Sequence, residues 1–182
     1  CCGSRDDDVE TVAYYYIAGE TEVAPIVTPE KWLITGFYEQ GDNWDVLLGA
    51  AFNDAEAELA DGSKTRPIQS PEWNYNGLLR YHIPLSSGSI ALQADFVYRD
   101  DVKFALTDAE TVQQDAYTLY NASITYTSAD ETWQVSAYVD NLTDEEYVVQ
   151  AFDLSSTDVF GMTEQYYGKP RWWGVSVKYS WF

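Results

Sequence analysis

The last twelve residues, RWWGVSVKYSWF (171–182), decide the fold because they alternate between large apolar and small polar side chains. The apolar positions are Trp173, Val175, Val177, Tyr179 and Trp181, and the positions between them are Gly174, Ser176, Lys178 and Ser180. A period of two residues predicts a β-strand with two unlike faces. Such a strand either buries its apolar face in a soluble core or turns that face toward lipid.

Five further segments repeat the alternation, at 44–52, 74–83, 90–99, 120–126 and 133–140. Their apolar registers are Trp44, Val46, Leu48, Ala50, Phe52; Tyr75, Gly77, Leu79, Tyr81, Ile83; Ile90, Leu92, Ala94, Phe96, Tyr98; Tyr120, Ala122, Ile124, Tyr126; and Trp133, Val135, Ala137, Val139. The Asp, Arg, Lys and His residues of the six strands all fall in the opposite register: Asp45, Arg80, His82, Asp95, Arg99, Asp140 and Lys178. Charges confined to one register indicate that the two faces are real, and we expect these seven side chains to face the lumen of a barrel.

The connections between the strands alternate in length. QGDN (40–43), PLSSGS (84–89) and TSADE (127–131) are tight turns rich in Gly, Asn, Asp and Ser, whereas 55–72, 101–116 and 143–170 are long and acidic. Short turns at one end and long polar loops at the other are typical of outer-membrane barrels. The sequence therefore predicts an all-β, antiparallel up-and-down transmembrane barrel segment of about six to eight strands, with short periplasmic turns and long extracellular loops.

The positions of the aromatic residues favour a membrane over a soluble core. Three apolar registers begin and end on aromatic residues, Trp44 to Phe52, Tyr120 to Tyr126 and Trp173 to Trp181. Aromatic residues gather at the two interfaces of a bilayer, with aliphatic residues between them. A soluble barrel shows the same alternation with the faces exchanged, but its core has no reason to place aromatics at strand ends.

The N-terminal part is harder to interpret. TVAYYYIAG (11–19) and EKWLITGFYE (30–39) are candidate strands, and ETEVAPIVTP (20–29) between them is predicted to be a loop because it holds two prolines. We treat residues 1–30 as a poorly defined boundary, with a possible strand and loop, and 31–182 as the barrel part. Eight strands would suffice to close a small barrel. The adjacent Cys1 and Cys2 indicate no disulfide framework.

Composition narrows the functional classes. Thirty acidic against ten basic residues, for a net charge of -20, argue against a nucleic-acid partner. No Ser–His–Asp catalytic set can be assigned, because the chain has a single histidine, His82, which is interpreted as a residue of the barrel wall. We therefore expect that the chain has no catalytic site and is not an enzyme. The clusters Asp108/Glu110 and Asp144/Glu145/Glu146 are interpreted as solvated loop residues rather than calcium ligands. We expect no metal and no cofactor.

Two motifs near the C-terminus carry a family resemblance. VDNLTDEEY (139–147) follows the penultimate strand, and YGKPRWWGVSVKYSWF (167–182) opens the last one. With the weaker SPEWNYNGLLRYHIPL (70–85), they resemble the C-terminal end of the barrel of a TonB-dependent outer-membrane receptor, over about residues 42–182. The residues that match the family motif are Asn141, Leu142, Asp144, Tyr147, Gly168, Pro170, Arg171 and Gly174.

The resemblance implies an importer in the outer membrane of a Gram-negative bacterium. Such receptors have barrels of about 22 strands, filled by a plug domain, and they import a scarce nutrient, often an iron chelate, with energy supplied by TonB. This chain would be the end of such a barrel, with outer-membrane lipid, the missing plug and the remaining strands as its partners. Two alternatives stay open: a complete eight-stranded outer-membrane barrel, and a soluble ligand-binding β-barrel.

Overall fold

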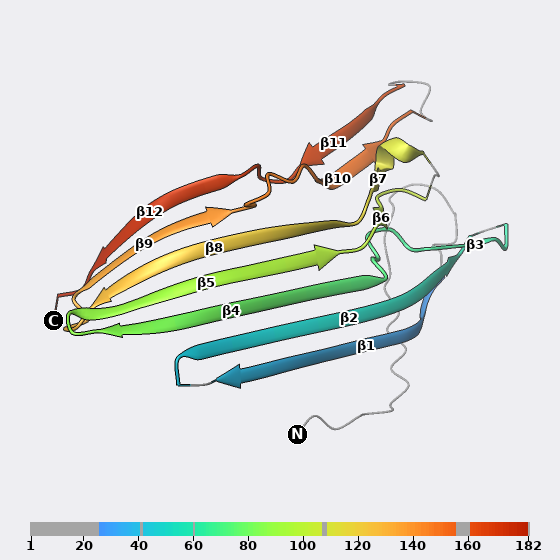
Figure 1. The fold of residues 1–182 in the computed structure, drawn as a ribbon. Coiled ribbons are helices and arrows are strands. Elements are labelled where there is room, and N and C mark those ends of the chain that lie inside the picture. Colours follow the sequence, from blue (N-terminus) through green and yellow to red (C-terminus); the bar gives the residue numbers. More distant parts are fainter. Residues whose placement is uncertain (1–25, 41, 60, 107–108, 156–160, 182) are drawn as a thin grey trace.

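The computed structural model describes residues 26–40, 42–59, 61–106, 109–155 and 161–181, and side chains from Asp42 onward (Figure 1). The elements are β1 (Ile26–Gln40), β2 (Trp44–Glu58), β3 (Lys64–Thr65), β4 (Trp73–Leu85), β5 (Gly88–Arg99), β6 (Val102–Lys103), the 3-10 helix η1 (Glu110–Val112), β7 (Gln113–Gln114), β8 (Tyr117–Ser128), β9 (Trp133–Asp140), β10 (Val148–Asp153), β11 (Thr163–Tyr167) and β12 (Trp172–Tyr179). In this part of the chain, no helix has the length and apolar character needed to cross a membrane.

Seven long strands form one antiparallel sheet in the order β1-β2-β4-β5-β8-β9-β12, and β3 adds a short pairing to the end of β2. Each of these strands lies beside the one that precedes it among them in the sequence, which is an up-and-down topology (Figure 1). The six segments with the clearest alternation lie in β2, β4, β5, β8, β9 and β12, although β12 ends at Tyr179 and Trp181 follows the strand. The predicted all-β antiparallel fold is therefore confirmed.

The register keeps the two faces separate across the sheet. One row of paired residues runs from Trp44 through Tyr81, Leu92, Ile124 and Ala137 to Val175, and the neighbouring row from Asp45 through Arg80, Gln93, Ser123 and Tyr138 to Gly174. Directly paired residues point to the same side of a sheet. One face is therefore apolar and the other largely polar over six strands.

Within the described part of the chain, the apolar face is not covered by a second layer. Leu92 is 41% exposed, Ile124 45% and Val175 65%. A contiguous apolar surface of this kind needs either a further layer of protein or an apolar medium to cover it.

Aromatic residues border the apolar face at both ends. At the short-turn end, the ring centroids of Trp44 and Tyr81 are 4.3 Å apart and those of Trp133 and Tyr179 are 4.6 Å apart. At the long-loop end, the ring centroids of Phe52 and Trp73 are 4.5 Å apart. The ring of Trp73 also contacts that of Tyr75, which contacts that of Tyr98. The arrangement matches the two interfacial belts of a membrane barrel.

Three long connections, β2–β4, β5–β8 and β9–β12, lie at one end of the sheet, and tight turns join the strands at the other end (Figure 1). The long connections contain structure that the sequence did not predict: β6, η1 and β7 lie between β5 and β8, and the hairpin β10–β11 lies between β9 and β12. The predicted loop at 55–72 begins too early, because β2 extends to Glu58 and pairs there with β1 and β3.

The prediction of a loop over 20–29 is wrong for its last residues. Strand β1 begins at Ile26, so 26–29 belong to the sheet. A proline is tolerated in an edge strand or at a bulge, and β1 has both: it lies at the edge of the sheet, and its pairing with β2 shifts between Pro29 and Lys31. The candidate strand at 11–19 lies outside the described residues.

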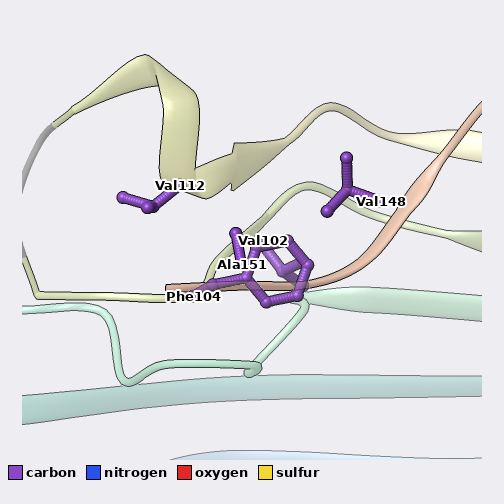
Figure 2. Close-up of a cluster of buried hydrophobic side chains, with 5 residues drawn as sticks. All are labelled: Val102, Phe104, Val112, Val148 and Ala151. Atoms are coloured by element: carbon purple, nitrogen blue, oxygen red, sulfur yellow. The ribbon is translucent and has the colours of Figure 1, made fainter. Parts of the chain in front are cut away.

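The main buried cluster lies among the loops rather than on the sheet. Val102, Phe104, Val112, Val148 and Ala151 are each at most 7% exposed and pack together (Figure 2). The first three come from the β5–β8 connection and the other two from the β9–β12 connection. Full burial of one such side chain contributes about 1.5–3 kcal/mol, so this cluster joins the two connections into a single body.

Candidate functional site

The site is built from the three long connections and the residues that attach them to the sheet. We call residues 59–72, 100–116 and 141–171, where described, the loop cap. Its attachment to β9 and β12, formed by Asn141, Asp144, Tyr147, Gly168 and Arg171, is called the clasp.

Asn141 is the centre of the clasp. Its φ angle of 52° lies in the left-handed region, which asparagine tolerates better than most residues, and the residue is only 4% exposed. Its Nδ2 group donates to the carbonyl oxygens of Glu145, at 2.8 Å, and Lys169, at 3.1 Å, while its Oδ1 atom accepts the Glu145 N–H at 2.8 Å. One buried amide therefore holds the two ends of the β9–β12 connection together.

Asp144 and Arg171 add a second link between these ends. The Oδ1 atom of Asp144 accepts the backbone N–H of Arg171 at 2.8 Å, and the guanidinium Nη2 lies 3.6 Å from Oδ2. Both side chains are half-exposed, so the ion pair itself contributes little and the hydrogen bond to the backbone sets the geometry.

Tyr147 and Gly168 make the closest approach in the clasp. The Gly168 N–H donates to the Tyr147 carbonyl at 2.8 Å, and a Cβ atom at position 168 would overlap the Tyr147 ring. That ring stacks on Tyr117 of β8, with centroids 4.7 Å apart. Glycine is needed here for close packing rather than for an unusual φ angle.

The other motif residues lie near the clasp without joining it. The Leu142 N–H donates to the Tyr120 carbonyl at 2.7 Å, although the Leu142 side chain is exposed. Gly174 pairs with Tyr138, whose hydroxyl would lie 2.6 Å from a Cβ atom at position 174. Pro170 is exposed, between the Lys169 carbonyl and the Arg171 N–H that the clasp uses.

A track of hydrogen bonds, with one longer ion pair between Asp45 and Arg80, crosses the polar face of the sheet. It begins near the turn end, where His82 Nε2 lies 2.9 Å from Asp45 Oδ2. The same Oδ2 atom is 4.0 Å from Arg80 Nη1, and Arg80 donates to Gln93 Oε1 from Nη2 at 2.6 Å and from Nε at 3.1 Å. The track therefore passes from β2 through β4 to β5.

The polar track continues to the clasp. Gln93 Nε2 donates to Asp95 at 3.1 Å, and Asp95 Oδ2 accepts from Asn121 Nδ2 at 2.7 Å. The Oδ1 atom of Asn121 then accepts the backbone N–H of Asn141 at 3.0 Å. Asn121 thus connects the wall of the sheet with the base of the longest connection.

The register places all seven residues expected in the lumen on the polar face: Asp45, Arg80, His82, Asp95, Arg99, Asp140 and Lys178. The first four belong to the polar track. Arg99, Asp140 and Lys178 lie outside it, opposite Asn74, Trp172 and Gln134 respectively. Gln93 and Asn121 were not predicted as site residues, although their polar register positions were visible in the sequence.

Hydrogen bonds join all three connections of the loop cap. Arg66 of the β2–β4 connection pairs with Asp101 of the β5–β8 connection at 2.8 Å. The Gln69 N–H donates to the Lys103 carbonyl at 2.8 Å, and Gln69 Nε2 donates to Gln150 Oε1 at 2.5 Å.

Hairpin β10–β11 is bonded to the β5–β8 connection as well as packed against it. The Val148 N–H donates to Gln114 Oε1 at 2.6 Å, and Gln165 Nε2 donates to the Thr111 carbonyl at 2.8 Å. Together with the buried cluster, these bonds make the loop cap a preformed surface.

No group of three or more His, Cys, Asp or Glu side chains gathers as a metal site within the described ranges, which exclude Asp108. Asp144 instead bonds with Arg171, and Glu145 and Glu146 are exposed.

Comparisons with known proteins agree with this architecture. The family model for the TonB dependent receptor-like β-barrel matches residues 21–142. The ferric yersiniabactin uptake receptor FyuA from Yersinia pestis has a similar structure, with a TM-score of 0.70 and 16% identity over 87% of this chain and 24% of that chain. The siderophore receptor PiuA from Acinetobacter baumannii gives a TM-score of 0.58 and 17% identity over 84% of this chain and 21% of that chain.

No curated protein sequence matches the chain. The chain spans about a quarter of the length of these two receptors, and at this identity they show the fold alone. The family model matches more than half of the chain. The chain therefore belongs to the TonB-dependent receptor β-barrel family.

Proposed function

We propose that the chain forms the C-terminal part of the barrel of an outer-membrane receptor that binds a scarce nutrient and imports it with energy supplied by TonB. Family membership is the observation that carries the proposal. One solved relative is named as a ferric yersiniabactin uptake receptor and the other as a siderophore receptor, which supports a siderophore-like iron chelate as the nutrient. Members of this family are receptors and transporters, and we propose no enzymatic activity for this chain.

The two faces of the sheet support a location in the outer membrane of a Gram-negative bacterium. The exposed apolar face, bordered by aromatic residues at both ends, suits outer-membrane lipid. The polar face, with the seven residues named above, is then the wall of the lumen. The short turns are periplasmic and the loop cap is extracellular in this arrangement, with residues 31–182 forming the barrel part.

The open edges of the sheet support further partners. In the described part of the chain, β1 pairs only with β2, and β12 only with β9. Strand edges in a membrane must be paired, so the remaining barrel strands are required on both sides. The family further implies a plug domain and contact with TonB through the N-terminal part. The acidic composition disfavours nucleic acid as a partner.

The alternatives are less well supported. The family match over residues 21–142, and two solved relatives of which this chain covers only 24% and 21%, favour part of a larger barrel over a complete eight-stranded one. A soluble barrel would cover its apolar face with itself, whereas that face is exposed in the described residues.

The proposal is tested by uptake in the bacterium that encodes the chain. Cells are grown under iron limitation and offered radiolabelled ferric chelates of several chemical classes, with and without the receptor gene. We expect at least one chelate to be taken up only when both the receptor and a functional TonB are present. Uptake that is the same without the receptor, or without TonB, for every chelate would contradict the proposal.

A further inference from the structure

Hairpin β10–β11 presents three side chains on one exposed face, Phe152, Glu164 and Tyr166. Phe152 pairs with Glu164 across the hairpin, and Tyr166 lies two residues from Glu164 on the same strand. The neighbouring register points the other way: Ala151 is buried in the cap cluster, and Gln165 bonds to Thr111. Phe152 is 47% exposed and Tyr166 48% exposed, so both rings remain available to a ligand.

We propose that this face, called the Phe152 face, binds a protonated amine of the imported ligand. The inference rests on the proposed import function and specifies the charge of the ligand. An ammonium group is attracted both by the faces of aromatic rings and by a carboxylate, and the Phe152 face offers the two together.

The three side chains hold one another in a fixed arrangement. The Tyr166 hydroxyl donates to Glu164 Oε1 at 2.6 Å, and the rings of Phe152 and Tyr166 meet edge to face with centroids 6.2 Å apart. A tyrosine hydroxyl is protonated at neutral pH and can donate, and the hydrogen bond to Glu164, followed by the charge of that carboxylate, raises the pKa of Tyr166 further. The tyrosine thereby orients the carboxylate instead of competing with it for a cation.

The surrounding charge also selects a cation. Residues 53–72, 100–116 and 141–171 contain sixteen acidic and five basic residues. Three of the five basic residues are already paired with carboxylates of the same region: Lys64 with Glu56, Arg66 with Asp101, and Arg171 with Asp144. The resulting negative field attracts cationic ligands to this end of the barrel and repels anionic chelates.

A matched pair of chelates tests the inference on the full-length receptor. One is a linear ferric trihydroxamate that ends in a free amine, and the other is the same chelate with that amine acetylated. The two differ by one positive charge. We expect the amine form to bind about tenfold tighter, as measured by equilibrium binding to the purified receptor in detergent.

Three variants connect the preference to the Phe152 face. Glu164→Gln removes the carboxylate and Phe152→Leu removes the ring while keeping apolar volume, and each is expected to reduce the preference to about threefold or less. Tyr166→Phe keeps both ring faces and is expected to retain most of the preference. Glu131→Gln, in a turn at the opposite end of the sheet, is the charge control and should leave the preference unchanged.

Equal binding of the two chelates, or an undiminished preference in Glu164→Gln, would overturn the inference while leaving the proposed function intact. Binding of neither chelate would also overturn it, because an amine-bearing chelate is then not a ligand. The proposed function is decided separately by the uptake experiment, which does not depend on the charge of the chelate.

Discussion

The sheet and the loop cap of this chain are stabilised in opposite ways. The sheet leaves its apolar face exposed and is held by strand pairing, by a polar track on its other face and, in the proposed receptor, by lipid. The loop cap has a small core of buried apolar side chains around Val112 and a buried amide, Asn141, at its base, as a soluble domain would. The difference implies that a substitution can destabilise one region without destabilising the other. The following substitutions test this separation, from the largest expected effect to the smallest.

The largest effect is expected in the core of the loop cap. Val112→Asp places an unpaired charge at a fully buried position, which costs about 3–5 kcal/mol. We expect amide exchange to accelerate in both 100–106 and 148–153 while the exchange of β8 and β9 stays slow. Val112→Ala is the control, with a smaller effect of about 2 kcal/mol. Faster exchange throughout the sheet would show that the two regions are not separate.

A charge on the apolar face has the next largest effect. Ile124→Lys lies near the middle of that face and costs about 2–4 kcal/mol in a bilayer. The neighbouring Ser123→Lys points to the polar face and should cost about 1 kcal/mol or less. Reversible unfolding of the full-length receptor in lipid vesicles measures both. Equal costs for the two variants would contradict the assignment of the faces.

The clasp is tested by Asn141→Ala. The substitution removes three side-chain hydrogen bonds and leaves the Lys169 carbonyl without this donor, at a cost of about 2–3 kcal/mol. We expect faster amide exchange in 142–147, with the core around Val112 retaining its protection. Leu142→Ala, whose side chain is exposed, serves as the control. Unchanged exchange in Asn141→Ala would show that the clasp does not hold the connection.

The smallest effect concerns the turn between β8 and β9. Hydrogen bonds from the Ser128 hydroxyl and then from Thr132 lower the pKa of Asp130 to about 2. Because the folded pKa lies below the unfolded value of about 4, the stabilisation is complete above pH 4 and is lost as the pH falls toward 2.

Ser128→Ala should therefore lower the melting temperature above pH 4, and the difference from the unmodified chain should shrink toward pH 2. Glu131→Gln changes the residue next to Asp130 and is the control; its melting temperature should not converge on that of the unmodified chain toward pH 2. A difference that stays constant from pH 2 to pH 6 would contradict this account of the turn.

The sheet could be predicted from sequence because its information is local. Strict alternation in segments such as 120–126 determines both the strand and its faces, and Gly, Asn, Asp and Ser mark the turns. The error at 26–29 arose from the weight given to Pro29, which an edge strand accommodates at a shift of register.

The loop cap could not be predicted in the same way, because its contacts join residues far apart in sequence. Val112 stands alone in an acidic segment, and the alternation of Val102 with Phe104 is too short to identify a strand; only packing against Val148 and Ala151 gives these residues a core. The motif residues could be identified in the sequence, but no local pattern predicts the hydrogen bond from Asn141 to the carbonyl of Lys169, 28 residues later. For the same reason, Asn121 showed its register but not its link to the clasp.

The most direct test of the two-faced sheet measures which residues contact lipid. Single cysteines at Ala122, Ser123, Ile124 and Thr125 in the full-length receptor are spin-labelled in a bilayer, and the accessibility of each label to oxygen is compared with its accessibility to a water-soluble nickel chelate. The account predicts oxygen-accessible labels at 122 and 124 and less accessible ones at 123 and 125. The opposite phase, or no alternation, would contradict it.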